Sequence, residues 1–130
     1  MTPGQAAYLA KATDSTAAAR VLLAEGFPDY AAGRAYYAMF HAVTVLLDHH
    51  GRTFKKHSTL LSAFSKLLHE TEVLPRECHR WIADAYNART ASDYRAERPI
   101  SSDEASVHIA NADRMIELVS RVVSTRTPEQ

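Results

Sequence analysis

Apolar side chains recur along this chain at the spacing of helices, and no segment alternates apolar and polar residues as a strand does. The clearest stripe occupies positions 60, 61, 64, 67 and 68, and another occupies positions 105, 109, 112, 116, 119 and 123. With weaker stripes elsewhere, the pattern predicts five helices, over residues 5–24, 29–50, 57–71, 76–92 and 101–125. Glycine or proline marks most of the breaks, at Gly26, Pro28, Gly51 and Pro75.

Segment 29–50 carries the widest apolar arc. Two stripes run along it, one from Tyr30 through Tyr37 to Leu47 and the other from Tyr36 to Leu46. A helix with so wide an apolar arc normally packs against more than one neighbour. We therefore expect one all-α domain over residues 1–130, ordered over about 5–125, with this helix at its centre. The expected architecture is an up-and-down four-helix bundle with an additional C-terminal helix.

A charged segment, residues 93–100, separates the last two predicted helices. It contains Pro99 and four charged side chains, which is typical of a loop or a frayed helix end. Ser101 and Glu104 then match a capping box, in which the serine hydroxyl accepts the third amide of the helix and the glutamate reaches back. The last helix is therefore expected to begin here.

Charge and cysteine content narrow the class of protein. Fifteen Lys and Arg residues balance fifteen Asp and Glu residues, which disfavours a broad basic surface for nucleic acid but allows a small local site. Cys78 is the single cysteine, so internal disulfides are excluded. The first residues lack the pattern of a signal peptide, and no apolar run is long enough to cross a bilayer. We expect a cytoplasmic protein with no membrane association.

Metal and cofactor chemistry finds little support in the sequence. The seven histidines form no i, i+4 pair and no Glu-x-x-His motif, which helix-borne metal sites use to bring two ligands together. No glycine-rich loop is present to hold a nucleotide phosphate. Cys78 and His79 are adjacent on a predicted helix and therefore diverge, which disfavours a catalytic dyad. We predict no metal and no cofactor.

A first candidate site lies in the central helix. Arg34 and His41 are seven residues apart and share one helix face, and Asp48 extends the same row. Aromatic residues flank the row. The alternative is that these aromatic rings fill the core and that His41 is a hydrogen-bonded core histidine.

A second candidate site lies at the end of the fourth predicted helix. Arg89 and Asp93 are four residues apart on one face, and Arg95 follows closely. Neighbouring aromatic residues would make a partly sheltered pocket. The alternative is an ordinary ion pair on the helix surface, which contributes little to stability.

A third candidate precedes the third predicted helix. Lys55, Lys56 and His57 form a small basic group at a helix start, where backbone amides are available to a phosphate. The alternative is a solvated loop.

Taken together, these three segments resemble the HEPN domain family. The resemblance is carried by residues 34–41 (RAYYAMFH), by Lys56 with His57, and by Arg89 followed by residues 93–95 (DYR). More narrowly, the chain is similar to small single-domain prokaryotic HEPN proteins that are often encoded beside a minimal nucleotidyltransferase. The resemblance covers about residues 5–125 and implies a helical bundle that forms a homodimer.

The resemblance also implies a chemistry. Many HEPN proteins are metal-independent ribonucleases that act as toxins or defence effectors, with an arginine and a histidine a few residues later. In such a reaction an RNA 2′-hydroxyl attacks the adjacent phosphate, with histidine as acid or base and arginine neutralising charge. This chain keeps Arg89 but has Asp93 and Tyr94 where the histidine is expected.

Two functions follow as hypotheses. The first is a toxin–antitoxin or defence ribonuclease in which Arg89 binds phosphate, Asp93 and Tyr94 position the RNA, and His57 or His41 transfers the proton. Its further phosphate-binding residues would be Arg34, Lys55, Lys56 and Arg95. The second is a non-catalytic nucleotide-binding, RNA-binding or structural dimer that acts with a nucleotidyltransferase-type antitoxin, for which Tyr94 would be an accessible target.

Overall fold

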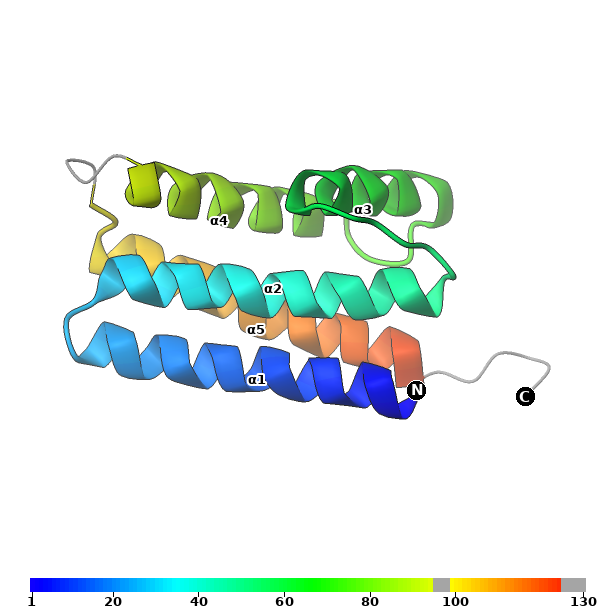
Figure 1. Ribbon diagram of the computed structural model, residues 1–130, viewed down its shortest axis with the longest axis horizontal. Coiled ribbons are helices and arrows are strands. Elements are labelled where there is room, and N and C mark those ends of the chain that lie inside the picture. Colours follow the sequence, from blue (N-terminus) through cyan, green and yellow to red (C-terminus); the bar gives the residue numbers. More distant parts are fainter. Residues whose placement is uncertain (95–98, 125–130) are drawn as a thin grey trace.

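The computed structural model describes residues 1–94 and 99–124, apart from the side chains of His57 and Tyr94, and its regular structure is entirely helical. The five helices are α1 (Pro3–Ala24), α2 (Pro28–His49), α3 (His57–Thr71), α4 (Glu77–Tyr94) and α5 (Ser102–Ser124) (Figure 1). The predicted all-helical bundle is confirmed. Each helix begins and ends close to the residues that the apolar periodicity indicates.

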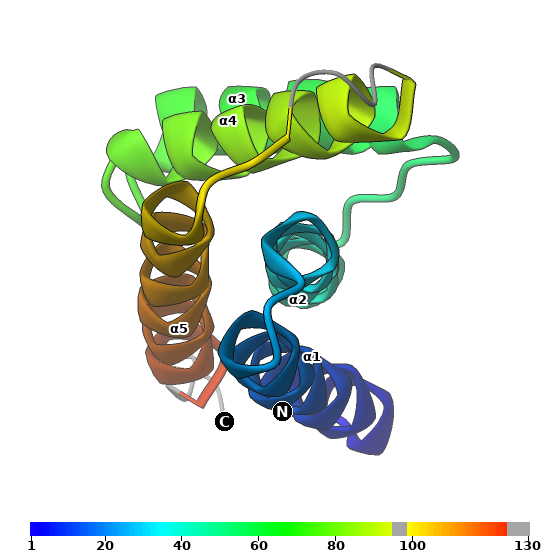
Figure 2. The ribbon, with the colours of Figure 1, turned by 90° about the vertical axis from the view of Figure 1, so that its left-hand side faces the viewer.

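α2 lies at the centre of the molecule and packs against each of the other helices. Figure 2 shows α1 and α5 beside it, with α3 and α4 forming a layer over α2 and α5. Eleven of the 22 residues of α2 are buried, and five of these are alanines, whose small side chains let neighbouring helices approach closely. The wide apolar arc of the sequence therefore reflects a helix that is enclosed on several sides.

α1 and α5 complete the bundle around α2. α1 begins at a capping box, in which the Thr2 hydroxyl accepts the Gln5 amide at 3.1 Å and the Gln5 side chain accepts the Thr2 amide at 3.0 Å. An ion pair between Arg20 and Asp113 joins α1 to α5. α5 packs against α1, α2 and α4, so the C-terminal helix is an integral part of the bundle.

α4 extends two residues beyond its predicted end. The charged segment predicts a loop or a frayed helix end from residue 93 onward, and Asp93 and Tyr94 are the last two residues of α4. A physical reason is the i, i+4 pair of Arg89 with Asp93, which favours one further helical turn. Ile100, beyond the segment 95–98, donates its amide to Asp29 Oδ1 at 2.6 Å, which ties the approach to α5 to the start of α2.

Candidate functional site

Two arginines from different helices converge on one tyrosine ring. The guanidinium carbon of Arg34, on α2, lies 4.6 Å from the ring centroid of Tyr37. The guanidinium carbon of Arg89, on α4, lies 4.9 Å from the same centroid. Both distances are within the range of a cation–π interaction. The fold therefore holds two positive charges at a single aromatic ring.

These side chains line a groove where the start of α2 meets the end of α4. Its volume is about 430 Å³, and we call it the Arg34–Arg89 groove. Its walls come from the end of α1, from the first turns of α2 and from the last turns of α4. The lining residues are Leu22, Asp29, Tyr30, Gly33, Arg34, Tyr37, Arg89 and Asp93.

Arg89 has an acidic neighbour on its own helix and a buried aromatic neighbour on α2. Asp93 Oδ2 lies 3.7 Å from Arg89 Nε, so the predicted pair forms at ion-pair distance. Tyr36 is fully buried beneath, with its ring centroid 5.7 Å from the Arg89 guanidinium carbon. Burial raises the pKa of the Tyr36 phenol well above its usual value, although the nearby Arg89 opposes this. Tyr36 is therefore a neutral aromatic floor for the guanidinium group.

The charges of the groove suit a phosphate-bearing ligand. A guanidinium group presents a planar fork of N–H donors that matches two phosphate oxygens. Of the two carboxylates in the groove, Asp29 already accepts the Ile100 amide and Asp93 sits beside Arg89. Arginine remains protonated at any physiological pH, so it neutralises charge but does not transfer a proton. The groove therefore presents two guanidinium groups to an anionic group, and Asp29 and Asp93 are the carboxylates among its described lining residues.

His41 does not line this groove, although it shares a face of α2 with Arg34. Its ring centroid lies 5.7 Å from that of Tyr8 and 5.9 Å from that of Phe40. Burial, together with the charges of Lys11 and Arg34, lowers the pKa of His41 below 6.5. Its buried Nδ1 has no hydrogen-bond partner among the described residues.

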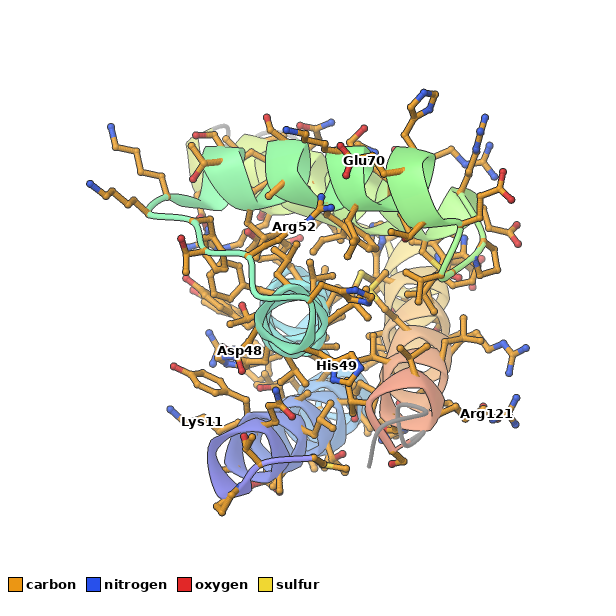
Figure 3. The ribbon with its side chains drawn as sticks, turned by 90° about the vertical axis from the view of Figure 1, so that its right-hand side faces the viewer. Lys11, Asp48, His49, Arg52, Glu70 and Arg121 are labelled. Atoms are coloured by element: carbon orange, nitrogen blue, oxygen red, sulfur yellow. The ribbon has the colours of Figure 1, made fainter. Side chains whose placement is uncertain are left out.

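Asp48, at the far end of the same row, is engaged by α1. Gln5 Nε2 donates to Asp48 Oδ2 at 2.8 Å. Figure 3 shows Asp48 and Lys11 on the α1 side of the molecule, with Arg52 on the opposite side of α2, reaching toward Glu70 of α3. The row predicted from the sequence is therefore divided between two different environments.

None of the described residues of the basic loop before α3 lines the groove. Lys55 and Lys56 are exposed, and both of their amides donate to the Thr59 hydroxyl, at 3.3 and 2.9 Å. These amides are therefore already satisfied at the helix start that was predicted to bind phosphate. The Phe54 ring packs 5.7 Å from Phe40 of α2, which places the loop one helical turn beyond Tyr36 and Tyr37.

Three predicted site elements lie outside the described residues. Arg95 belongs to the segment 95–98, and the side chains of His57 and Tyr94 are not described. The backbone places His57 at the first position of α3 and Tyr94 at the last position of α4. Their roles therefore stay predictions.

The sequence predicted aromatic residues beside both arginines, but it did not predict that Tyr30 is exposed at the groove or that both arginines meet at Tyr37. The apolar periodicity assigns Tyr30 and Tyr37 to a stripe of α2, but Tyr30 is 69% exposed and Tyr37 is contacted by both arginines. The signal is present in the spacing. Tyr30 lies four residues before Arg34 and Tyr37 three residues after it, so all three share one helix face.

Cys78 and His79, the adjacent pair on α4, lie in different surroundings. Cys78 is fully buried, and burial raises the pKa of its thiol to about 11. In its Nε2–H tautomer, His79 donates instead to the Leu61 carbonyl at 3.2 Å.

Among the residues that the structure describes, no three His, Cys, Asp or Glu side chains gather closely enough to hold a metal ion. Within the same residues, every helix is too short or too polar to cross a bilayer.

Comparison with known proteins identifies the family. Residues 6–122 match the HEPN domain. A UPF0332 protein of Gloeobacter violaceus is 35% identical over 119 residues, which cover 91% of this chain and 94% of that protein. A Methanocaldococcus jannaschii protein described as a candidate toxin is 39% identical over 95 residues, or 73% of this chain and 65% of that protein. A second candidate toxin of that organism is 27% identical over 112 residues, 86% of this chain and 83% of that protein. The chain therefore belongs to the HEPN domain family.

Proposed function

We propose that this HEPN protein is a cytoplasmic toxin or defence component that binds RNA in the Arg34–Arg89 groove. The similarity to two candidate toxins supports the biological role. The observation that carries the site is the convergence of the Arg34 and Arg89 guanidinium groups on Tyr37. Two fixed cations at the edge of an open groove match the phosphate groups of a nucleic acid backbone.

The reaction in this proposal is metal-independent cleavage of the bound RNA. The 2′-oxygen attacks the adjacent phosphorus, the bond to the 5′-oxygen breaks, and a 2′,3′-cyclic phosphate and a 5′-hydroxyl result. One group removes the 2′-hydroxyl proton and another protonates the departing 5′-oxygen. Arg34 and Arg89 would stabilise the extra negative charge on the phosphorane.

Proton transfer is the part of the reaction that needs a further residue. Asp93, one of the two lining carboxylates, is our candidate to accept the 2′-hydroxyl proton, and Tyr94 follows it at the end of α4. His57, at the start of α3, is our candidate for the acid. His41 is a weaker candidate, because Tyr8 and Phe40 pack against its ring and it does not line the groove.

RNA or nucleotide binding without cleavage is the second candidate. The specific observation in its favour is that none of the described side chains lining the groove is a histidine. In this version the chain acts as a homodimer together with a nucleotidyltransferase-type antitoxin, which would modify Tyr94. ATP-dependent addition of a nucleotidyl group to Tyr94 by a minimal nucleotidyltransferase, measured by mass spectrometry, would test that partner.

The decisive experiment incubates the purified protein with labelled total RNA in EDTA. Arg89→Ala and His57→Ala are run beside the wild type, and Arg80→Ala, an exposed arginine of α4 that does not line the groove, is the matched control. We expect cleavage by the wild type and by Arg80→Ala, and none by Arg89→Ala. Loss of cleavage in His57→Ala would identify the acid.

The same samples separate the two candidates. RNA that is bound but intact at high protein concentration would replace the ribonuclease with the binding module. Neither binding nor cleavage by the wild type would contradict the proposed function. Cleavage that Arg89→Ala retains in full would place the reaction elsewhere on the protein.

A further inference from the structure

An exposed pair of aromatic rings lies at the mouth of the Arg34–Arg89 groove. Tyr30 is 69% exposed and Phe27 is 50% exposed, although both are large apolar side chains. Their ring centroids are 6.2 Å apart, with an interplanar angle of 71°, so one ring meets the other edge to face. The pair sits at the turn between α1 and α2, and Tyr30 also lines the groove.

Tyr30, Arg34 and Tyr37 lie on one continuous face of α2, which Phe27 precedes and which Arg89 approaches from α4. Tyr30 precedes Arg34 by one helical turn, and Arg34 in turn contacts the Tyr37 ring. The row therefore presents an exposed ring, a guanidinium group and a second ring in succession. A nucleotide has the same alternation, because a flat base and a charged phosphate are joined by one sugar.

We propose that Tyr30, supported by Phe27, is a stacking platform for an unpaired base whose phosphate is held by Arg34 and Arg89. This inference rests on the proposed function and narrows its ligand to single-stranded RNA. Base stacking on an exposed aromatic ring is a general mode of single-strand recognition, and it is tolerant of sequence because every base has a flat face. A duplex keeps its bases stacked on one another, so it cannot offer one to Tyr30.

Charge favours RNA over a protein partner as the occupant. The aromatic pair adjoins two guanidinium groups. Two carboxylates also line the groove: Asp93 lies 3.7 Å from Arg89, and Asp29 accepts the Ile100 amide. A nucleic acid offers both flat bases to the exposed rings and phosphates to the two guanidinium groups. An apolar protein surface would match the rings but would offer no anionic group to Arg34 and Arg89.

The test measures stacking and phosphate binding separately. The full chain is titrated against a single-stranded RNA of about ten nucleotides that contains 2-aminopurine, whose fluorescence falls when the base stacks. Inorganic polyphosphate is the phosphate-only probe. The variants are Tyr30→Ala, Tyr30→Phe and Arg89→Ala, and the matched control is Tyr8→Ala, an exposed tyrosine of α1 that does not line the groove.

We expect Tyr30→Ala to weaken RNA binding by at least about fivefold and to abolish the fluorescence change. Tyr30→Phe and Tyr8→Ala should bind RNA like the wild type, and polyphosphate binding should be unchanged in Tyr30→Ala. RNA binding that depends on Arg89 but not on Tyr30 would overturn the stacking platform alone. Conversion of a dimer to a monomer by Tyr30→Ala, with RNA binding intact, would overturn it in favour of a protein interface. A wild type that binds neither probe would overturn the proposed function itself.

Discussion

Arg34 and Asp48 occupy two ends of one row on α2, and their surroundings are opposite. At the Arg34 end, the groove of about 430 Å³ is open, and a second cation reaches it from α4. At the Asp48 end, the adjoining cavity is smaller, about 270 Å³, and the carboxylate already accepts the Gln5 side chain from α1. One end has charge available for a ligand, and the other uses its charge to join two helices.

The difference shows what helical spacing can and cannot determine. Spacing by seven places Arg34, His41 and Asp48 on one face. Whether that face is open depends on the neighbouring helix. The first turns of α1 reach the second half of α2 through Gln5 and Tyr8, while the turn after α1 leaves Phe27 and Tyr30 exposed beside the first half.

The largest predicted effect is a loss of RNA affinity that occurs when the groove at the Arg34 end is altered and not when the Asp48 end is altered. Arg89→Ala removes a charged group that binds phosphate, and we expect affinity for single-stranded RNA to fall by about tenfold or more. The dependence of log affinity on log salt should also become shallower, by about 0.7 for each RNA phosphate that the protein no longer neutralises. Fluorescence anisotropy at several salt concentrations measures both quantities.

Asp48→Ala is the control at the other end of the row. It removes a negative charge on α2 without touching the groove, so affinity and salt dependence should stay near the wild-type values. An increase in affinity in Asp48→Ala as large as the decrease in Arg89→Ala would mean that general charge, rather than the groove, controls binding.

The second prediction tests whether the hydrogen bonds at the Asp48 end stabilise the fold. Gln5 is almost fully buried, and its side chain bonds both to the Thr2 amide and to the Asp48 carboxylate. Gln5→Ala should lower the free energy of unfolding by about 1–2 kcal/mol, because these hydrogen bonds can no longer form. Urea titration followed by circular dichroism measures the change. RNA affinity should be unaffected, and a parallel decrease in RNA binding would contradict the division between the two ends.

The sequence predicted where the helices begin and end, but it said little about how the helices pack against one another. The stripe from Leu60 to Leu68 predicted α3 with the bounds that the structure shows, because burial on one face imposes the helical period directly. The convergence of Arg34 and Arg89 on the Tyr37 ring could not be predicted from the helical period. It depends on how α4 lies against α2, and no local pattern encodes that packing.

Tyr30 shows the same limit within a single stripe. Its spacing from Tyr37 suggests a buried position, but Tyr30 is 69% exposed, whereas Ala31 and Ala32 beside it are fully buried, so neighbouring helices cover only one side of α2 at this end. Arg89 and Asp93 illustrate the opposite case. Their i, i+4 spacing alone predicted the pair, because both residues belong to one helix.

A smaller effect should come from Gly33, which lines the groove between Tyr30 and Arg34. It lies inside α2, and a Cβ atom added there would meet nothing within 4 Å. Gly33→Ala should therefore raise the free energy of unfolding by about 0.5–1 kcal/mol, because glycine weakens a helix interior. The same urea titration measures this change in stability. Ala10→Gly, at an exposed position of α1, is the control in the reverse direction. Weaker RNA binding despite higher stability would show that the groove needs the small residue, whereas lower stability would contradict the open space at this position.

The smallest effect concerns His41, between the two ends. Burial, Lys11 of α1 and Arg34 of α2 lower its pKa below 6.5, while the Tyr8 and Phe40 rings pack against it. As pH falls through 6.5, the unfolded chain takes up a proton that the folded chain refuses, so stability should decline until the folded pKa is passed. His50, whose pKa is also lowered by burial and by His49 and Arg52, contributes in the same direction.

Urea midpoints at about pH 7.5 and pH 5.5 test this contribution. The drop between them should be smaller in His41→Gln than in the wild type, and smaller again in the variant that also carries His50→Gln. Lys11→Ala should raise the His41 pKa in an NMR titration, because it removes a positive neighbour supplied by α1. Arg34→Ala should raise it as well, which would show that His41 senses the open end of the row as well as the closed one. A His41 pKa that responds to Lys11 alone would mean that the two ends are electrostatically separate, and that the Arg34 charge is available to the groove without influencing the rest of α2.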